Sequence, residues 1–231
     1  MIPIEIPPNT VMLRGHGWDS NVYLVKDEDE GEALIIDTGT GVYWHKYMDV
    51  WLNENYLNGI ERITIFNTHE HFDHVGGNPA FRRYFEERGI KVYFAAHRYT
   101  AQALESGDDY VILSFYYGRS YTPHEVHLKL GDGDTLRVGK LRLTLIHTPG
   151  HTRGSACLYE PEEKLLFTGD TIFNGTVGRT DLPTGNLEML KKSIEKLEKL
   201  DVYLGLPGHG RIIKNWKENF EYVKHLLEEL E

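Results

Sequence analysis

The chain has a single cysteine, Cys157, among its 231 residues. One cysteine excludes an intrachain disulfide and a cluster of thiolate metal ligands. We expect Cys157 to be a small buried apolar residue of a strand rather than a nucleophile, because the sequence assigns no base to it. A metal site in this chain must therefore use nitrogen and oxygen ligands.

Long apolar runs and positive charge are also scarce. No apolar segment reaches the roughly 20 residues that a membrane-spanning helix needs, and residues 1–5 lack the charged and apolar regions of a secretory signal. The formal net charge is −10, which argues against nucleic acid as the main partner because nucleic-acid-binding proteins usually carry a basic stripe. We therefore expect a cytoplasmic protein that acts on a small molecule, without a membrane or nucleic-acid partner. The oligomeric state stays open.

The chain shows no linker rich in serine, glycine or proline, and 40% of its residues are hydrophobic. Single α/β domains of this length are ordinary, so we expect one domain over residues 1–231. Residues 22–25 and 33–36 predict paired strands joined by an acidic turn. Asn78 and Pro79 are typical of the N-cap and first position of a helix that continues to about Arg88. Helical spacing of apolar residues predicts two more helices, over residues 187–200 and 216–230.

The most informative segment is His69-Glu70-His71-Phe72-Asp73-His74, which follows an apolar run at residues 63–66. Neutral imidazole and carboxylate are good ligands for zinc, iron and manganese. Residues two apart point to the same side of an extended chain but to nearly opposite sides of a helix. His69 and His71 can therefore bind one ion only if the segment is extended or looped, and Asp73 and His74 could then serve a second ion. A chance cluster in a histidine-rich loop is the alternative.

Three later segments share one pattern, a polar residue in a Gly/Pro-rich turn after an apolar run. They are His147-Thr148-Pro149-Gly150-His151, Thr168-Gly169-Asp170-Thr171 and Pro207-Gly208-His209-Gly210. Turns at the ends of several strands can converge in one crevice, the usual location of sites in open α/β sheets. The candidate ligands are then His69, His71, Asp73, His74, His151, Asp170 and His209. This set is too large for one tetrahedral zinc and suits two ions that share a bridge.

The order of these motifs, H-x-H-x-D-H, a lone His, G-D-T and P-G-H-G, resembles the metallo-β-lactamase superfamily over essentially the whole chain. The segments from Thr68 to Asn78, from His147 to His151, and Gly178-Arg179-Thr180-Asp181 are similar to the glyoxalase II-like (hydroxyacylglutathione hydrolase-like) hydrolases. The resemblance implies an α/β fold, the αββα sandwich of two mixed β-sheets with helices on the outer faces.

The resemblance also implies a role for each ligand. His69, His71 and His151 would hold the first metal, Asp73, His74 and His209 the second, and Asp170 would bridge both. A metal-bridging hydroxide would attack the substrate, and Asp73, as the expected catalytic residue, would orient it and relay its proton. We expect two divalent ions, preferably Zn²⁺, with iron or manganese as alternatives because nitrogen and oxygen ligands accept all three.

Three further features have more than one interpretation. Asp37 could orient the ligand loop or form an Asx turn before Gly39. Arg179 lies where glyoxalase II proteins place a basic residue towards the glutathione carboxylates, which predicts substrate binding, but it could simply pair with Asp181. Asp181 also departs from the aromatic residue that those proteins have nearby. The aromatic stretch from Tyr110 to Tyr121 could be core, an interface or a pocket wall.

We therefore expect a metal-dependent hydrolase of a small thioester. Glyoxalase II proteins proper carry a helical C-terminal extension that helps to bind glutathione, whereas about one expected helix follows His209 here. A compact glyoxalase II-like thioesterase is thus the expected class. A persulfide dioxygenase-type oxidoreductase with one iron is the first alternative, and a lactonase is the second.

Overall fold

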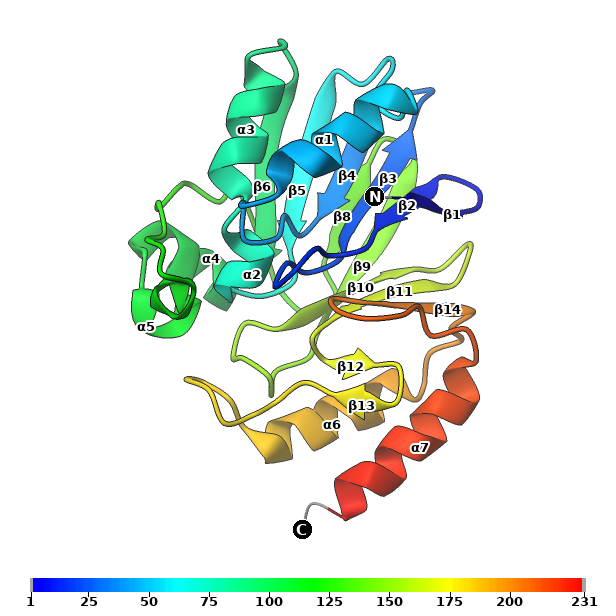
Figure 1. The fold of residues 1–231 in the computed structure, drawn as a ribbon. Coiled ribbons are helices and arrows are strands. Elements are labelled where there is room, and N and C mark those ends of the chain that lie inside the picture. Colours follow the sequence, from blue (N-terminus) through cyan, green and yellow to red (C-terminus); the bar gives the residue numbers. More distant parts are fainter. Residues whose placement is uncertain (1, 230–231) are drawn as a thin grey trace.

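In the computed structural model, which describes residues 2–229, two β-sheets pack face to face between outer layers of helices (Figure 1). The first sheet has seven strands in chain order, antiparallel from β1 to β4 and parallel from β4 to β7. Its strands are β1 (Ile4–Ile6), β2 (Thr10–Leu13), β3 (Val22–Asp27), β4 (Glu32–Ile36), β5 (Arg62–Asn67), β6 (Lys91–His97) and β7 (Leu128–Leu130).

The second sheet has the strand order β14-β11-β10-β9-β8. Only β11 and β14 are parallel neighbours, so this sheet is mixed like the first. Its strands are β8 (Thr135–Val138), β9 (Leu141–His147), β10 (Ala156–Glu160), β11 (Leu165–Gly169) and β14 (Leu204–Pro207). A separate hairpin joins β12 (Ile172–Phe173) to β13 (Thr176–Val177).

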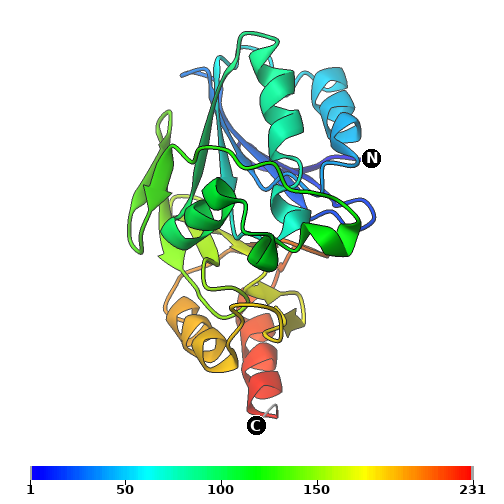
Figure 2. The ribbon, with the colours of Figure 1, turned by 90° about the vertical axis from the view of Figure 1, so that its left-hand side faces the viewer.

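Helices form the outer layers of the fold. The helical segments are α1 (Trp44–Asn53), α2 (Phe72–Val75), α3 (Asn78–Glu86), α4 (Arg98–Ser106), α5 (Asp109–Ile112), the 3₁₀ turn η1 (Ser114–Tyr117), α6 (Leu187–Leu197) and α7 (Trp216–Glu228). Two views place α1 and α3 on the side of the first sheet, and α6 and α7 on the side of the second (Figures 1 and 2). Among residues 2–229, no helix is long and apolar enough to cross a membrane.

Three apolar layers hold this sandwich together. Trp51 and Phe81 pack α1 and α3 against the first sheet, Phe66 and Phe167 meet between the sheets, and Ile194 belongs to the layer that joins α6 and α7 to the second sheet. Most of the buried strand residues are apolar, and their removal from water is the main stabilising contribution. The predicted αββα sandwich of two mixed sheets is confirmed.

The prediction for the start of α3 was wrong in one respect. Gly77, and not Asn78, is the N-cap, and it makes no side-chain cap hydrogen bond. The Asn78 side chain is buried instead, where its amide nitrogen donates to Asn67 (2.8 Å) and its oxygen accepts from the Thr38 hydroxyl (2.9 Å). Asn78 therefore ties the start of α3 to the ends of β4 and β5, a tertiary role that local capping preference does not predict.

The two helices predicted near the C-terminus are present with shorter bounds. The helix α6 ends at Leu197, so Leu200 lies beyond it and packs on the same apolar layer as a partly buried residue. The helix α7 ends at Glu228, and Leu230, which was predicted to lie on its apolar stripe, is outside the described residues. The predicted strands at residues 22–25 and 33–36 are the antiparallel neighbours β3 and β4.

Candidate metal centre

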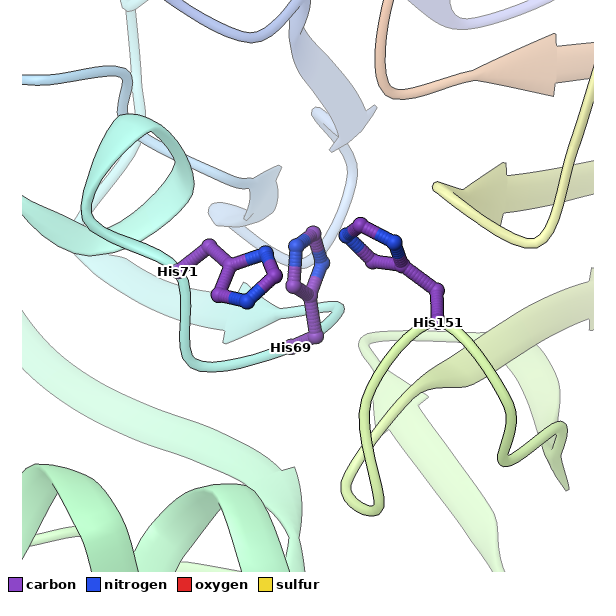
Figure 3. Close-up of side chains that lie close together, drawn as sticks. All are labelled: His69, His71 and His151. Atoms are coloured by element: carbon purple, nitrogen blue, oxygen red, sulfur yellow. The ribbon is translucent and has the colours of Figure 1, made fainter. Parts of the chain in front are cut away.

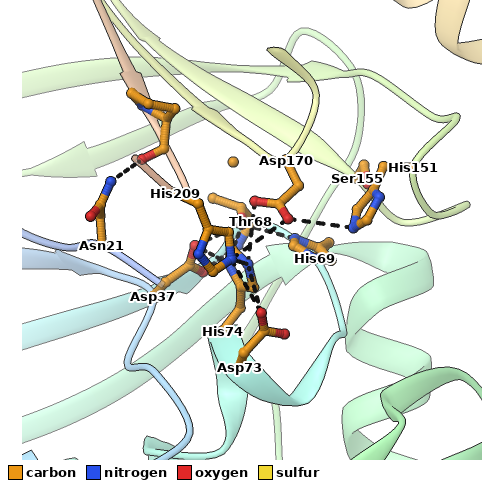
Figure 4. Close-up of polar contacts among 12 residues, drawn as sticks. Asn21, Asp37, Thr68, His69, Asp73, His74, His151, Ser155, Asp170 and His209 are labelled. Atoms are coloured by element: carbon orange, nitrogen blue, oxygen red, sulfur yellow. Dashed lines mark hydrogen bonds and ion pairs between the residues drawn. The ribbon is translucent and has the colours of Figure 1, made fainter. Parts of the chain in front are cut away.

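The seven predicted ligands gather where the two sheets meet, on segments that follow strands of both sheets. Figure 4 labels all of them except His71, which Figure 3 shows. The turn after β5 carries the His69 to His74 segment, and β9, β11 and β14 lead into the turns of His151, Asp170 and His209. Residues separated by up to 140 positions thus reach one place because strand ends of both sheets share one edge of the sandwich. The predicted convergence of these turns is confirmed.

His69, His71 and His151 form the first cluster (Figure 3). Each offers a ring nitrogen within 4.8 Å of the others, and all three side chains are buried. Among residues 2–229, none of their three Nε2 atoms has a hydrogen-bond partner. Buried polar atoms are almost always paired, so three converging and unpaired imidazole nitrogens fit a divalent cation bound between them.

Asp73, His74 and His209 form the second cluster. The His209 Nε2 atom lies 3.1 Å from Asp73 Oδ2 and 3.1 Å from His74 Nε2. The ligand atoms of all three side chains lie within 4.8 Å of one another. One carboxylate and two imidazoles at these distances fit one divalent cation.

Asp170 lies between the two clusters. Its Oδ1 is 3.3 Å from His74 Nε2, and its Oδ2 is 3.6 Å from His151 Nε2 and 3.7 Å from His209 Nε2. One carboxylate therefore faces ligands of both clusters, which is the geometry that a bridging ligand requires.

Proton affinities in the centre follow from burial and from crowding of charge. Burial and the neighbouring His151 lower the pKa of His71 to about 3, so its imidazole is neutral at pH 7, the form that binds metal. Burial alone would raise the pKa of Asp170, but the His74 and His209 imidazoles hold it well below its ordinary value. Burial would likewise lower the pKa of His74, but the carboxylates of Asp170 and Asp37 raise it. Without metal, protons on imidazoles balance these carboxylates, and bound cations would take over that balance.

Asp37 contacts the ligand loop with both carboxylate oxygens. Its Oδ1 accepts the backbone N–H of Thr68 (2.9 Å), and its Oδ2 accepts the Thr68 hydroxyl (2.8 Å). The same Oδ2 lies 2.8 Å from Nδ1 of His74, which leaves Nε2 of that ring directed at Asp170 and His209. This is the arrangement in which a carboxylate orients a ligating histidine, and the predicted orienting role of Asp37 remains a prediction.

Glycine is required at position 208 of the Pro207-Gly208-His209-Gly210 turn. A Cβ atom there would lie 2.2 Å from Asp170 Oδ1 and 2.7 Å from His74 Cε1. The turn is fixed from the first sheet, where the Asn21 amide and the Tyr23 hydroxyl both donate to the Pro207 carbonyl oxygen (2.9 and 2.7 Å). These anchors lie almost 190 residues before the turn, so sequence analysis gave no sign of them.

Glu70 is another residue whose role sequence analysis missed. It is buried and lies in the sequence between the predicted ligands His69 and His71, and its Oε2 accepts the hydroxyls of Thr100 (2.9 Å) and Thr152 (3.1 Å). Glu70 thereby links the ligand loop to α4 and to the turn of His151. The Nδ1 atom of His151 is held in turn by the carbonyl oxygen of Arg179 at 2.7 Å.

A cavity of about 710 Å³ opens above His71, Asp73, His151 and Asp170. This volume is typical of small-molecule sites. Its walls are largely apolar or aromatic and include Trp18, Tyr43, Leu113, Tyr116, Tyr117 and Leu182. A larger cavity of about 800 Å³ lies between β1 and α7, but none of the seven predicted ligands lines it, so we take the smaller one as the substrate site.

The aromatic stretch from Tyr110 to Tyr121 divides between two locations. Tyr116 and Tyr117 line the cavity, whereas Tyr110 is exposed and does not. Burial and the Asp73 carboxylate beside it raise the pKa of Tyr117, so this hydroxyl keeps its proton and can donate a hydrogen bond. Arg179 also lines the cavity, but its guanidinium is paired with Asp181 through two hydrogen bonds of 2.7 and 2.6 Å.

Comparison with known proteins agrees with this geometry. A sequence model of the metallo-beta-lactamase superfamily matches residues 16–209. The chain belongs to this superfamily. That range contains all seven predicted ligands.

Relatives and solved structures in the superfamily cover most of the chain. A probable metallo-hydrolase of Methanocaldococcus jannaschii is 34% identical over 211 residues, which cover 87% of this chain and 92% of the relative. An acyl-coenzyme A thioesterase of Homo sapiens is 30% identical over 220 residues, which cover 84% of this chain and 74% of the relative. The fold also matches the crystal structure of the B3 metallo-beta-lactamase BLEG-1 with a TM-score of 0.75 and 28% sequence identity. This match covers 90% of this chain and 95% of the other.

Proposed function

We propose that the protein is a metal-dependent hydrolase that cleaves a small thioester with the help of two bound ions. The observation that carries this proposal is the placement of Asp170 between two clusters of three ligands each. When bound, two divalent ions would supply a hydroxide nucleophile near neutral pH and polarise the carbonyl that it attacks. Zinc is the metal that we propose, since the ligands are nitrogen and oxygen atoms and the chemistry needs no redox change.

The residues of the chain would then perform separate tasks. Asp73 faces the cavity and the second cluster at once, so we assign to it the orientation of the attacking hydroxide and the removal of its proton. The protonated Tyr117 hydroxyl lies beside Asp73 and could donate to the oxygen of the substrate carbonyl as charge develops on it. A thiolate is a good leaving group, so departure of the thiol needs little acid catalysis.

Two observations support a thioester as the substrate. The cavity walls are mostly apolar and suit an acyl chain, and a human relative that covers 84% of this chain is an acyl-coenzyme A thioesterase. We therefore propose a glyoxalase II-like thioesterase. A one-iron dioxygenase would use only three ligands and would leave Asp73, His74 and His209 without a part in its chemistry.

The test is hydrolysis of a panel of thioesters by protein loaded with two zinc ions. Acyl-coenzyme A, acyl-glutathione and acyl-N-acetylcysteamine substrates are compared through the thiol that they release, with a lactone and a persulfide as alternative substrates. Asp170→Asn should lower thioester turnover at least about a hundredfold. The matched control Asp181→Asn changes an exposed carboxylate on a nearby turn and should keep most of the activity. Two bound ions without hydrolysis of any thioester would refute the proposal.

A further inference from the structure

Two arginines line the substrate cavity, and they differ in their partners. Arg179 is neutralised by the two hydrogen bonds with Asp181. Arg119 forms no ion pair with a carboxylate of residues 2–229. A guanidinium that already binds a carboxylate at both ends of its fork has little capacity for a second anion, whereas an unpaired one retains its full capacity.

Arg119 lies at the end of a turn that is held firmly in place. The backbone N–H of Ser114 donates to the Asp109 carboxylate (2.9 Å), the N–H of Arg119 donates to the Ser114 carbonyl (3.2 Å), and the Ser114 hydroxyl lies 3.1 Å from the Arg119 carbonyl oxygen. Leu113 opens this turn with a φ of 66°. A leucine in the left-handed region costs conformational energy, and such positions concentrate at functional sites.

The same turn is fixed to the ligand loop. The Tyr117 ring packs against the Phe72 ring, with centroids 5.4 Å apart, and Phe72 begins α2 between the ligands His71 and Asp73. These contacts fix the backbone of Arg119 relative to the predicted metal ligands, and its exposed side chain lines the cavity from there.

The charge of the protein makes a local cation significant for substrate binding. The formal net charge of −10 disfavours anionic ligands at long range. The carboxylates at the base of the cavity, Asp73 and Asp170, would be balanced by bound ions. An unpaired arginine at this cavity then attracts a negative group of the substrate that extends beyond the reacting carbonyl.

We propose that Arg119, and not Arg179, binds an oxyanion on the thiol half of the substrate, either a phosphate or a carboxylate. This proposal rests on the proposed thioester hydrolysis and specifies which kind of thiol the enzyme accepts. Phosphate would point to a coenzyme A-like thiol and carboxylate to a glutathione-like thiol, and both bind guanidinium in a bidentate manner.

The experiment compares anionic with neutral thioesters that carry the same acyl group. The anionic substrates are acyl-coenzyme A and acyl-glutathione, and the neutral one is acyl-N-acetylcysteamine. The measured quantity is the ratio of kcat/KM for each anionic substrate to kcat/KM for the neutral one. Arg119→Gln should lower this ratio by about tenfold or more for one of the two anionic thiols, mainly through KM. Arg179→Gln, and Arg142→Gln at the end of β9 away from the His151 turn, should keep the ratio within about twofold of wild type.

A binding measurement separates this proposal from the proposed function. Calorimetry with dethio-coenzyme A and S-methylglutathione, which cannot be hydrolysed, should show that Arg119→Gln weakens the preferred ligand by the same factor at an unchanged metal content. If wild type cleaves no thioester, the proposed function fails, and this binding arm still decides on Arg119. The proposal is overturned if neither ligand binds to wild type, if Arg119→Gln binds as wild type does, or if Arg179→Gln lowers the ratio as strongly as Arg119→Gln.

Discussion

Replacement of Asp37 by asparagine isolates the contribution of one carboxylate to the second metal cluster. Asparagine tolerates the left-handed backbone at this position, where φ is 58°, better than most residues do. The substitution preserves size and shape, so the backbone turn should survive. What changes is that one of the two carboxylate oxygens becomes an amide NH₂ group.

The structure sets the size of the effect. The three donors around Asp37 are the N–H and hydroxyl of Thr68 and the Nδ1 atom of His74, all at 2.8–2.9 Å. Whichever oxygen is replaced, an NH₂ group then faces at least one donor. A hydrogen bond to a charged group contributes about 1.5–3 kcal/mol, which corresponds to about 10- to 100-fold in affinity. Loss of the partner of a metal-ligating histidine typically costs the same factor.

Asp37→Asn should therefore weaken binding of one ion by about 10- to 100-fold and change the other much less. Competition with a chromophoric chelator measures both affinities. The matched control is Asp27→Asn. Asp27 is the last residue of β3, at the end of the strand away from Asp37, and its buried carboxylate accepts the backbone N–H of Lys140 (2.7 Å). The control should lower stability without a change in either affinity. Affinities within about threefold of wild type for both ions in Asp37→Asn would refute the orienting role.

Three further predictions follow from other contacts. Gly208→Ala should reduce metal content and turnover together, because the alanine Cβ would lie 2.2 Å from Asp170 Oδ1. Two bound ions in this variant, measured by elemental analysis, would contradict the close approach of this turn to Asp170. Tyr117→Phe should lower kcat by about tenfold at full metal content, whereas Tyr110→Phe, outside the cavity, should not. Equal rates in the two variants would exclude a catalytic role for the Tyr117 hydroxyl. Burial and the stacked imidazole of His147 lower the pKa of His97 from 6.5 to about 4. Between pH 6.5 and about 4, the folded state therefore binds fewer protons than the unfolded state, and the folded state loses stability as the pH falls through this range. Urea unfolding of metal-free protein at pH 7 and about 4.5 should show a smaller loss in His97→Gln than in wild type, and an identical loss would show that this imidazole does not contribute.

The candidate metal ligands were predictable from sequence because the relevant information is local. Each candidate ligand lies within a few residues of the end of an apolar strand, five of them in turns and Asp73 and His74 in the short helix α2. The spacing of His69 and His71 requires an extended or looped segment. The structure has that loop, which ends where α2 begins at Phe72. The strands β3 and β4 and the helices α6 and α7 were predictable for the same reason, since their apolar periodicity matches the faces that they bury. The arrangement of two sheets was expected only from the resemblance to the superfamily, and the helices α1, α4 and α5 were not predicted.

The supporting contacts were not predictable because they depend on tertiary proximity. Glu70 receives hydroxyls from Thr100 and Thr152, which come from two other elements. Asn78 has the sequence signature of a helix cap, but buried partners from neighbouring strand ends outweigh that local preference. Arg119 is one of several surface arginines in the sequence, and only the folded turn places it at the cavity.

The most direct test of a two-metal centre is a count of bound ions in protein purified without chelator. Elemental analysis should find two ions per chain in wild type, and anomalous diffraction should place one between His69, His71 and His151 and the other between Asp73, His74 and His209. His71→Ala and His209→Ala should each retain about one ion at limiting metal, because each removes a ligand from one cluster only. A single ion in fully loaded wild type, or ions located outside these residues, would contradict the account.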